Sequence, residues 1–422
     1  MIVDLCRRLL LIAAAANLAL LPTGALTYWR SVSFGFGALF ALTLVGAALL
    51  RRTERIPSPG PAVLLPLLLW SVWATASLLW SAHPEYTAGE LRREVGWNFV
   101  TMVIFYVAAS DARAWRTLML TGLGSLALMS ALAVGLAIFG VSWSTGNWHA
   151  GVGAYATYLV IAAPLLLVLM APAPAGFRDG RRSLAVGLLL LALLLAAARL
   201  TDNRMVWVAL AAACATAAGL AGFRWRATFA RAPARWLALP LVLLVAMGVL
   251  FTDAAREKAK VYFPPDTTVA QTIEHDPRLV LWNRTAARIA ERPWTGYGFG
   301  KAILEHELRG ELRDPLLAHA HNVFVSQWLQ TGAVGFLLFV ALLAAIAWRY
   351  VRFYRAENDT LAFLGVLGLT LMVGFLVKNL TDDFLTRSNA KEFWALNAML
   401  LGWGIRQERA ARAGAGRRPA SP

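Results

Sequence analysis

The sequence predicts an all-α polytopic membrane protein, and three observations carry this prediction. Of the 422 residues, 59% are hydrophobic and only 15% are charged, which is too apolar for one soluble core of this length. The apolar residues gather in runs of about 16 to 22, the length at which a helix crosses roughly 30 Å of hydrocarbon. Short charged loops separate these runs, without the strict alternation of apolar and polar residues that membrane barrels need.

Two other classes of protein are excluded by how the charges and cysteines are placed. The formal net charge is +16, but a nucleic-acid-binding protein gathers its basic residues on one solvated surface, whereas here they are scattered between apolar spans. Only Cys6 and Cys214 are present, so neither a disulfide framework nor a cysteine metal site is expected. Helix packing must hold the fold together.

Twelve apolar spans divide the chain into four parts. Nine spans lie in residues 1–251 and three in residues 322–405, while residues 252–321 form one large polar loop that we expect to contain short helices. The tail, residues 406–422, is rich in Arg, Ala, Gly and Pro, and we expect it to be disordered because it cannot bury enough apolar surface. The spans are expected at 9–22, 34–50, 62–80, 95–109, 118–139, 153–171, 183–198, 205–222, 236–251, 322–347, 360–377 and 393–405.

The basic residues predict the orientation, because Arg and Lys in short loops stay on the cytoplasmic side. Arginine clusters occupy alternate loops, from Arg7 and Arg8 near the start to the tail that follows Arg406. Both termini are therefore expected in the cytoplasm. The large loop, residues 252–321, is expected at the periplasmic face, since long loops cross the membrane largely regardless of charge.

The large loop should contain a short helix that begins at Asp276 and Pro277, which resemble an N-cap followed by proline at the first helical position. The helix should end near Glu291 or Arg292. It places Arg278 at its N-terminus, where backbone N–H groups also favour an anion; the alternative is a solvated or headgroup-binding arginine. The apolar side of this helix suits a membrane surface or neighbouring helices and consists of Leu281, Trp282, Thr285 and Ile289.

The run TGYGFGK follows this helix, with glycines at positions 296, 298 and 300 and with Lys301 at its end. Glycine permits tight turns and a close approach of the backbone to a ligand. The run is not a Walker motif, and it lacks the strand and helix context of a dinucleotide site. Gly298 and its neighbours therefore form either a plain turn or one wall of an active site.

A pair of histidines, His319 and His321, stands immediately before the tenth span, and Asn322 is placed to cap the helix of that span. A histidine at such an entrance can stay neutral and accept a proton from a hydroxyl near pH 7. A metal site would need three or more ligands, and only residues 305–307 offer others nearby. A purely structural histidine is the remaining alternative.

Two further outer loops carry charged residues. The loop ARLTDNRMVW holds Arg199, Asp202 and Arg204, and a cation there is costly unless it reaches water, pairs or meets an anion. The loop KNLTDDFLTRSNAKEFW holds Asp382 and Asp383. These two acids either orient a histidine or arginine or form surface ion pairs.

Three segments, LTDNRMVW, RLVLWNRTAARIAERPWTGYGFG and HAHNVFVSQWLQTGAVGF, together resemble the O-antigen ligase and polymerase superfamily in order, spacing and predicted outer location. The resemblance covers about residues 140–400. It implies that Arg204 and Arg278 bind the donor diphosphate and that His321 is the catalytic base. Secondary candidates for the site are His319, Asn322, Trp282, Gly298, Lys301 and Asp382.

The resemblance also implies a membrane fold similar to that of lipid-linked sugar transferases, the GT-C class. Members of the family are inverting, metal-independent glycosyltransferases that need no cofactor and take a glycan from undecaprenyl diphosphate. The expected function is O-antigen ligase of the bacterial inner membrane, with lipid A core as acceptor and membrane lipids as surroundings. An O-antigen polymerase or an O-linked protein oligosaccharyltransferase would use the same donor, and a lipid-linked glycan transporter is the non-enzyme alternative.

Overall fold

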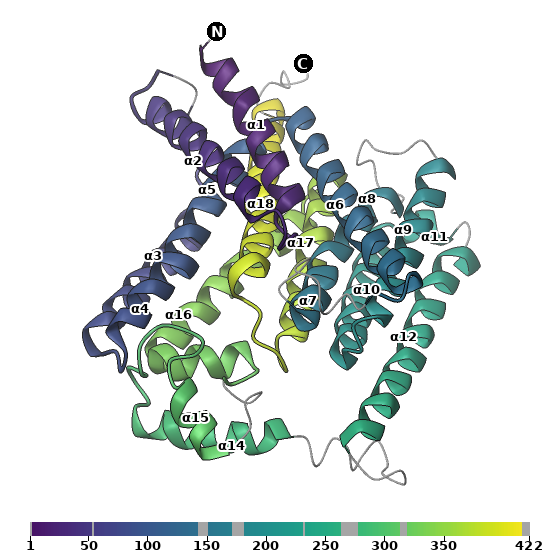
Figure 1. The fold of residues 1–422 in the computed structure, drawn as a ribbon. Coiled ribbons are helices and arrows are strands. Elements are labelled where there is room, and N and C mark those ends of the chain that lie inside the picture. The colour runs from purple at the N-terminus through teal and green to yellow at the C-terminus, as the bar shows by residue number, and fades with distance from the viewer. Residues whose placement is uncertain are drawn as a thin grey trace, which may run out of the picture.

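The computed structural model describes residues 2–52, 55–141, 151–170, 181–230, 233–262, 277–312 and 319–415, and these residues form a helical bundle (Figure 1). Helix α1 (Ile2–Leu20) begins and helix α18 (Arg387–Ala415) ends at the top of the view in Figure 1, and α14 (Pro277–Glu291) and α15 (Glu305–Leu312) lie at the bottom. The first half contains α1 (Ile2–Leu20), α2 (Thr27–Leu49), α3 (Pro61–Ala76), η1 (Ser77–Trp80), α4 (Pro84–Glu90), η2 (Leu91–Gly96), α5 (Trp97–Ala108), α6 (Ala112–Ile138), α7 (Val152–Ala162), η4 (Ala163–Leu166) and α8 (Leu167–Met170). The second half contains α9 (Arg181–Arg199), α10 (Arg204–Arg224), α11 (Arg226–Ala230), α12 (Pro233–Tyr262), α14 (Pro277–Glu291), α15 (Glu305–Leu312), α16 (Val323–Tyr354), α17 (Asp359–Lys378) and α18 (Arg387–Ala415).

Within the described residues, nine helices are long and apolar enough to cross a membrane, which confirms a polytopic membrane protein. Helices also occupy the other three expected spans, but each falls short of that standard. Helix α1 carries Asp4, Arg7 and Arg8 in its first two turns, α5 has only 12 residues, and α18 is charged at both ends. The number twelve therefore remains a prediction.

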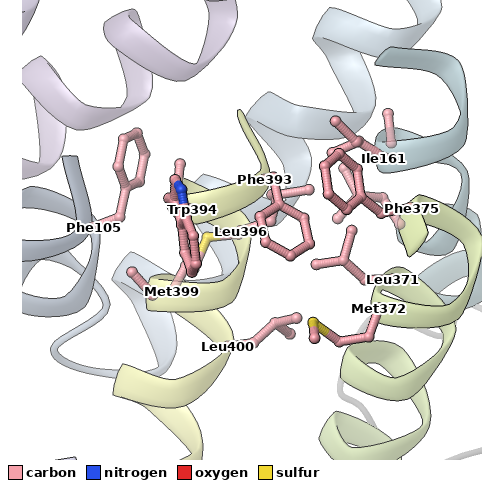
Figure 2. Close-up of a cluster of buried hydrophobic side chains, with 14 of the residues drawn as sticks. Phe105, Ile161, Leu371, Met372, Phe375, Phe393, Trp394, Leu396, Met399 and Leu400 are labelled. Atoms are coloured by element: carbon pink, nitrogen blue, oxygen red, sulfur yellow. The ribbon is translucent and has the colours of Figure 1, made fainter. Parts of the chain in front are cut away.

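The centre of the bundle is α17, which packs against α10, α16 and α18. Phe375 of α17 stacks on Phe393 of α18, with 4.1 Å between the ring centroids (Figure 2). On another side, Gly374 lets α17 approach α10 so closely that an added Cβ would lie 3.2 Å from Ala213. Small residues at such crossings let helix backbones pack closely inside a membrane.

One ion pair fixes the relative direction of α10 and α17. Arg224 at the end of α10 pairs with Asp359 at the start of α17, with 3.1 Å between Nη2 and Oδ1. The two helices are therefore antiparallel, and the start of α10 lies at the same end of the bundle as the end of α17. We call this end, which holds Arg204 and Lys378, the loop end, and we call the end that holds Arg224 and Asp359 the opposite end.

Helix α16 is broken at Gly332, whereas the sequence predicts one unbroken span over residues 322–347. Gly332 adopts φ 66° and ψ −174°, a backbone conformation that is essentially restricted to glycine. The backbone of Trp294 lies against it, so that an added Cβ would be 2.1 Å from the Trp294 carbonyl carbon. The preceding loop thus occupies the space that a regular helix would need.

Two predicted boundaries also differ from the structure. Helix α12 continues to Tyr262, past the expected boundary at residue 251. Helix α18 continues to Ala415, past the expected start of the tail at residue 406. The extension of α18 is stabilised by Glu408, whose carboxylate accepts hydrogen bonds from Arg349 and from Arg412 one turn later. Residues 416–422 lie outside the described part of the chain.

Candidate active site

Helix α14 holds Arg278 beside the loop that precedes α16. The helix begins at Pro277, as predicted; Asp276, its expected cap, lies outside the described residues. Leu281 is fully buried, and Trp282 donates from Nε1 to the backbone oxygen of Ala320 at 2.7 Å. The apolar side of α14 therefore packs against neighbouring elements, in a small core built from Leu281, Tyr297, Ile303, Leu304, Leu308 and Leu329.

Asn322 fixes the start of α16, as the sequence predicts. Its side-chain Oδ1 accepts hydrogen bonds from the backbone N–H groups of Phe324 and Val325, at 2.9 and 3.1 Å. Its Nδ2 donates to the backbone oxygen of Leu380 at 2.8 Å. One side chain thus caps α16 and joins it to the loop that follows α17, so His321 is held at a defined junction.

His321 and His319 lie in contact in front of this cap. Their ring centroids are 3.9 Å apart, and His321 has φ 46°, in the left-handed region. Burial, together with the positive charges of Lys301 and Arg278, lowers the pKa of His319 to about 2. His319 is therefore neutral at physiological pH.

A buried carboxylate, Asp382, joins Arg278 to Lys378. The Asp382 Oδ1 lies 3.7 Å from Nη2 of Arg278, and its Oδ2 accepts a hydrogen bond from Nζ of Lys378. The side chain of Lys378 is 0% exposed and that of Asp382 is 6% exposed. Burial alone would raise the pKa of Asp382, but Lys378 and Arg278, together with nearby His321, hold it below its usual value. Asp382 is therefore ionised and electrostatically coupled to Arg278 and His321.

Lys301 adds a third cation to this group. Its Nζ donates to the backbone oxygen of Asp383 and lies 4.8 Å from the centroid of the Phe384 ring. Lys378 lies 5.7 Å from the same centroid. An aromatic face attracts cations electrostatically, so Phe384 helps to hold two ammonium groups close together.

The glycine run packs the loop against its neighbours. Gly298 has φ 112°, and an added Cβ would lie 2.4 Å from Oγ of Ser81. Its N–H donates to the backbone oxygen of Gln330 at 2.9 Å, and the N–H of Phe299 donates to Oγ of Ser77 at 2.9 Å. These contacts give Gly298 a packing role that positions Lys301. A direct contact of Gly298 with substrate stays a prediction.

Arg204 is the first residue of α10. The preceding residue, Asn203, caps the helix, because its side chain accepts a hydrogen bond from the N–H of Met205 at 3.0 Å. It lies at the loop end of the bundle, the end that also holds Lys378. Arg199 pairs with Asp202 at 2.8 Å and with Asp253 at 2.9 Å. The structure thus brings Arg278, His319, His321 and Asp382 into one group and places Arg204 at the same end, on the neighbouring helix α10.

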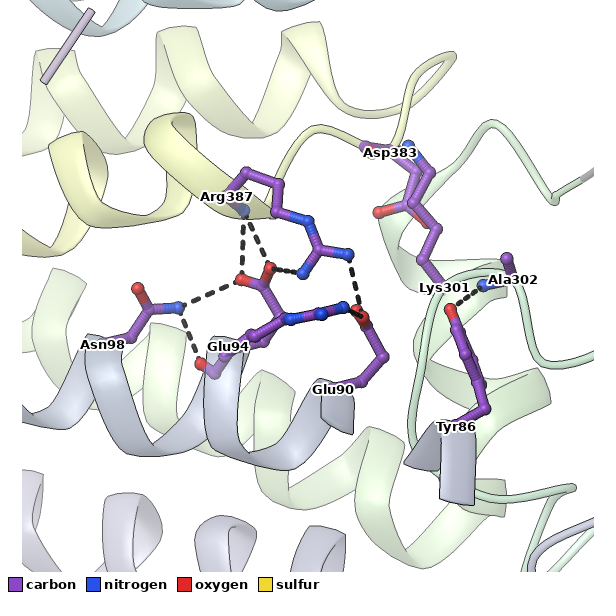
Figure 3. Close-up of polar contacts among 9 residues, drawn as sticks. Tyr86, Glu90, Glu94, Asn98, Lys301, Ala302, Asp383 and Arg387 are labelled. Atoms are coloured by element: carbon purple, nitrogen blue, oxygen red, sulfur yellow. Dashed lines mark hydrogen bonds and ion pairs between the residues drawn. The ribbon is translucent and has the colours of Figure 1, made fainter. Parts of the chain in front are cut away.

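A charged network beside the glycine run was not foreseen from the sequence (Figure 3). Arg387 pairs with Glu90 and with Glu94, each at 2.8 Å, although both carboxylates are almost fully buried. Tyr86 on the same segment accepts a hydrogen bond from the N–H of Ala302 at 2.9 Å, and burial raises the Tyr86 pKa to about 12. The signal in the sequence is ELRRE, in which acids stand beside an apolar span. The network fixes the backbone next to Lys301.

The described residues contain no group of three or more His, Cys, Asp or Glu side chains placed to hold a metal ion. Metal independence itself remains a prediction. The polar residues Asn147 and His149 of the loop 140–153 lie outside the described part of the chain.

Part of the chain is similar to a known protein family. Residues 189–340 match a protein-family model described as O-Antigen ligase, and this range contains Arg204, Arg278 and His321. No curated protein matches the sequence. Residues 189–340 are therefore similar to the O-antigen ligase family.

Proposed function

We propose that this protein is an O-antigen ligase. It transfers a glycan from undecaprenyl diphosphate to a hydroxyl of the lipid A core oligosaccharide, at the periplasmic face of the bacterial inner membrane. The observation that carries this proposal is the grouping of Arg278 and His321 around the buried carboxylate of Asp382. An anion-binding cation and a proton acceptor stand together there, at the entrance of a membrane helix.

The donor site uses Arg278 and Arg204. Breaking the bond between the sugar and the diphosphate leaves the electron pair, and therefore negative charge, on the leaving phosphate oxygen. Charge-assisted hydrogen bonds from arginine stabilise such a group, each by about 1.5–3 kcal/mol. The guanidinium of Arg278 is a planar fork of five N–H donors that matches phosphate geometry, and Asp382 holds it in position. This chemistry needs no divalent ion.

The acceptor site uses His321. The acceptor hydroxyl loses its proton to the imidazole of His321, and its oxygen attacks the anomeric carbon from the face opposite the diphosphate, which inverts that carbon. General-base catalysis of this kind typically contributes about 10² to 10⁴ in rate. The neutral ring of His319 beside it does not repel the proton that His321 takes up.

The acceptor separates the proposed ligase from a polymerase, which would use the same donor and similar residues. The single large loop late in the chain favours the ligase. The decisive experiment supplies purified protein with lipid-linked glycan and rough lipopolysaccharide and identifies the product by mass spectrometry. A glycan on lipid A core supports the ligase, whereas a longer lipid-linked glycan, or modified protein, overturns it.

Two measurements test the proposed mechanism. His321→Ala should abolish transfer and leave binding of the lipid-linked donor largely intact, because the base does not hold the diphosphate. His306→Ala is the matched control, since His306 lies on α15 with an exposed side chain. Full activity of His321→Ala would exclude His321 as the general base. Activity should also persist in excess chelator, and a loss restored by Mg²⁺ or Mn²⁺ would contradict the arginine-based donor site.

A further inference from the structure

A cavity of about 600 Å³ lies among the membrane helices, apart from the candidate active site. It is lined by η4, α8, α9, α10, α11 and α12, and by Thr370 of α17. Among the described residues that line it, all except Thr370, Cys214 and Arg226 are apolar or glycine. Its volume lies within the range of about 300–1,000 Å³ that is typical of pockets for small ligands. Such a lining suits a hydrocarbon chain.

The polar end of the cavity lies away from the active site. Arg226 lines the cavity just after the end of α10, next to Arg224, so it belongs to the opposite end of the bundle. Arg224 already pairs with Asp359, whereas Arg226 is exposed. An exposed arginine at the mouth of an apolar cavity suits a ligand with an anionic head and an apolar tail.

The length of the cavity suits one half of a bilayer. Along α10 its lining runs from Leu210 to Gly222, which is about 18 Å at the helical rise of 1.5 Å per residue. Half of the hydrocarbon core of a bilayer is about 15 Å thick. A chain that enters beside Arg226 would therefore end near the middle of the membrane.

We propose that this cavity binds an anionic phospholipid of the leaflet at the opposite end of the bundle, with its phosphate at Arg226 and an acyl chain along α10. The site is separate from the proposed donor site at Arg278 and Arg204. A bound lipid would fill the space between α8, α9, α10 and α12 and stabilise the packing of α10, the helix that begins with Arg204.

Cys214 gives a direct readout of occupancy because it lines the cavity. In full-length protein carrying Cys6→Ser, the only remaining thiol is Cys214, and its rate of reaction with N-ethylmaleimide can be measured in detergent. Dioleoylphosphatidylglycerol should slow this reaction at least tenfold. Dioleoylphosphatidylcholine has the same chains without a net negative charge and should protect far less. Equal protection by both lipids, or none by either, overturns the proposal.

Two variants separate the head of the ligand from its chain. Arg226→Gln should weaken protection by phosphatidylglycerol about fivefold, the effect of one arginine near an anionic lipid. Ala218→Phe should abolish protection, because it fills the cavity. Ala215→Phe is the matched control, since Ala215 is exposed on the same helix and does not line the cavity. Unchanged protection in Arg226→Gln contradicts the proposal even if Ala218→Phe fails to fold.

A prenyl lipid is the competing occupant. Undecaprenyl phosphate carries a similar charge on a different chain, so it should protect Cys214 only at higher concentrations than phosphatidylglycerol. Protection by undecaprenyl phosphate at lower concentrations would overturn the proposal and assign the cavity to a prenyl chain.

Discussion

Replacing Asp382 by Asn tests whether this carboxylate both stabilises the fold and positions Arg278 in the proposed donor site. The change keeps the size of the side chain and removes its negative charge. Lys378, whose side chain is 0% exposed, then loses its counter-ion, and Arg278, which is 22% exposed, loses the carboxylate 3.7 Å away. The two cations differ in their access to water, so they should respond differently.

The larger loss of stability should come from Lys378. Removing one partner of a buried ion pair typically costs about 3–5 kcal/mol, because it leaves an uncompensated charge in a medium that solvates it poorly. Arg278 reaches solvent and should lose far less. Its position should change, however, and a displacement of about 1 Å in an active site can lower the rate on the order of 10². Asp382→Asn should therefore be both less stable and much less active than the unmodified protein.

A double variant separates these two effects. Lys378→Met combined with Asp382→Asn removes both buried charges, and it should recover most of the thermal stability while transfer stays low, because Arg278 still lacks the Asp382 carboxylate. Stability is measured as the unfolding midpoint in detergent, and activity as glycan transfer to rough lipopolysaccharide. A single variant as stable as the unmodified protein, or a double variant with full activity, would refute this reasoning.

Three further predictions concern the surroundings of the site. Gly332→Ala should destabilise the protein by at least about 2 kcal/mol, because its φ of 66° is strained for alanine and the new Cβ meets Trp294; an unchanged unfolding midpoint would contradict the observed break in α16. Asn322→Ala should lower the free energy of unfolding by about 1 kcal/mol, because it removes the helix cap. Asn322→Asp should cost less, since it keeps the acceptor oxygen and loses only the hydrogen bond to Leu380. A smaller loss in the alanine variant than in the aspartate variant would contradict the cap. The pKa of His319 is about 2 in the folded protein and about 6.5 in the unfolded chain, so protonation of His319 favours the unfolded chain. The free energy of unfolding should therefore be highest above pH 6.5 and fall as the pH drops below it, by about 1.4 kcal/mol at pH 5.5. The unfolding midpoint should therefore fall less between pH 7.5 and 5.5 in His319→Asn than in the unmodified protein. Equal decreases in the two proteins would contradict the low pKa of His319.

Features determined by a few adjacent residues could be predicted from the sequence. The start of α14 at Pro277 and the capping of α16 by Asn322 are confirmed, because a cap depends on one side chain and the N–H groups two or three residues later. The apolar side of α14 is equally local, since it follows from helical spacing. The sequence did not determine what covers that side, which proved to be the small core containing Leu281 and Tyr297.

Features that depend on distant parts of the chain were missed. Arg387 and Glu90 are 297 residues apart in sequence, and no local pattern links them. The break at Gly332 depends on Trp294 in the same way, because a glycine inside an apolar run is also compatible with an unbroken membrane helix. The pairing of Arg278 with Asp382 was only one of two alternatives, since the sequence could not show which cation the acid meets.

The backbone of His321 gives an independent reason to place function there. A residue other than glycine with φ 46° is strained by about 1–3 kcal/mol and keeps that conformation only when its surroundings impose it. Contacts of the residues on both sides of His321 impose this conformation. Trp282 donates a hydrogen bond to the carbonyl of Ala320, and Asn322 is hydrogen-bonded to α16 and to Leu380. If the backbone conformation alone mattered here, glycine would adopt it without this strain. The strain is therefore best explained by a requirement for the imidazole ring itself, next to Asp382 and Arg278, where the proposed transfer takes place.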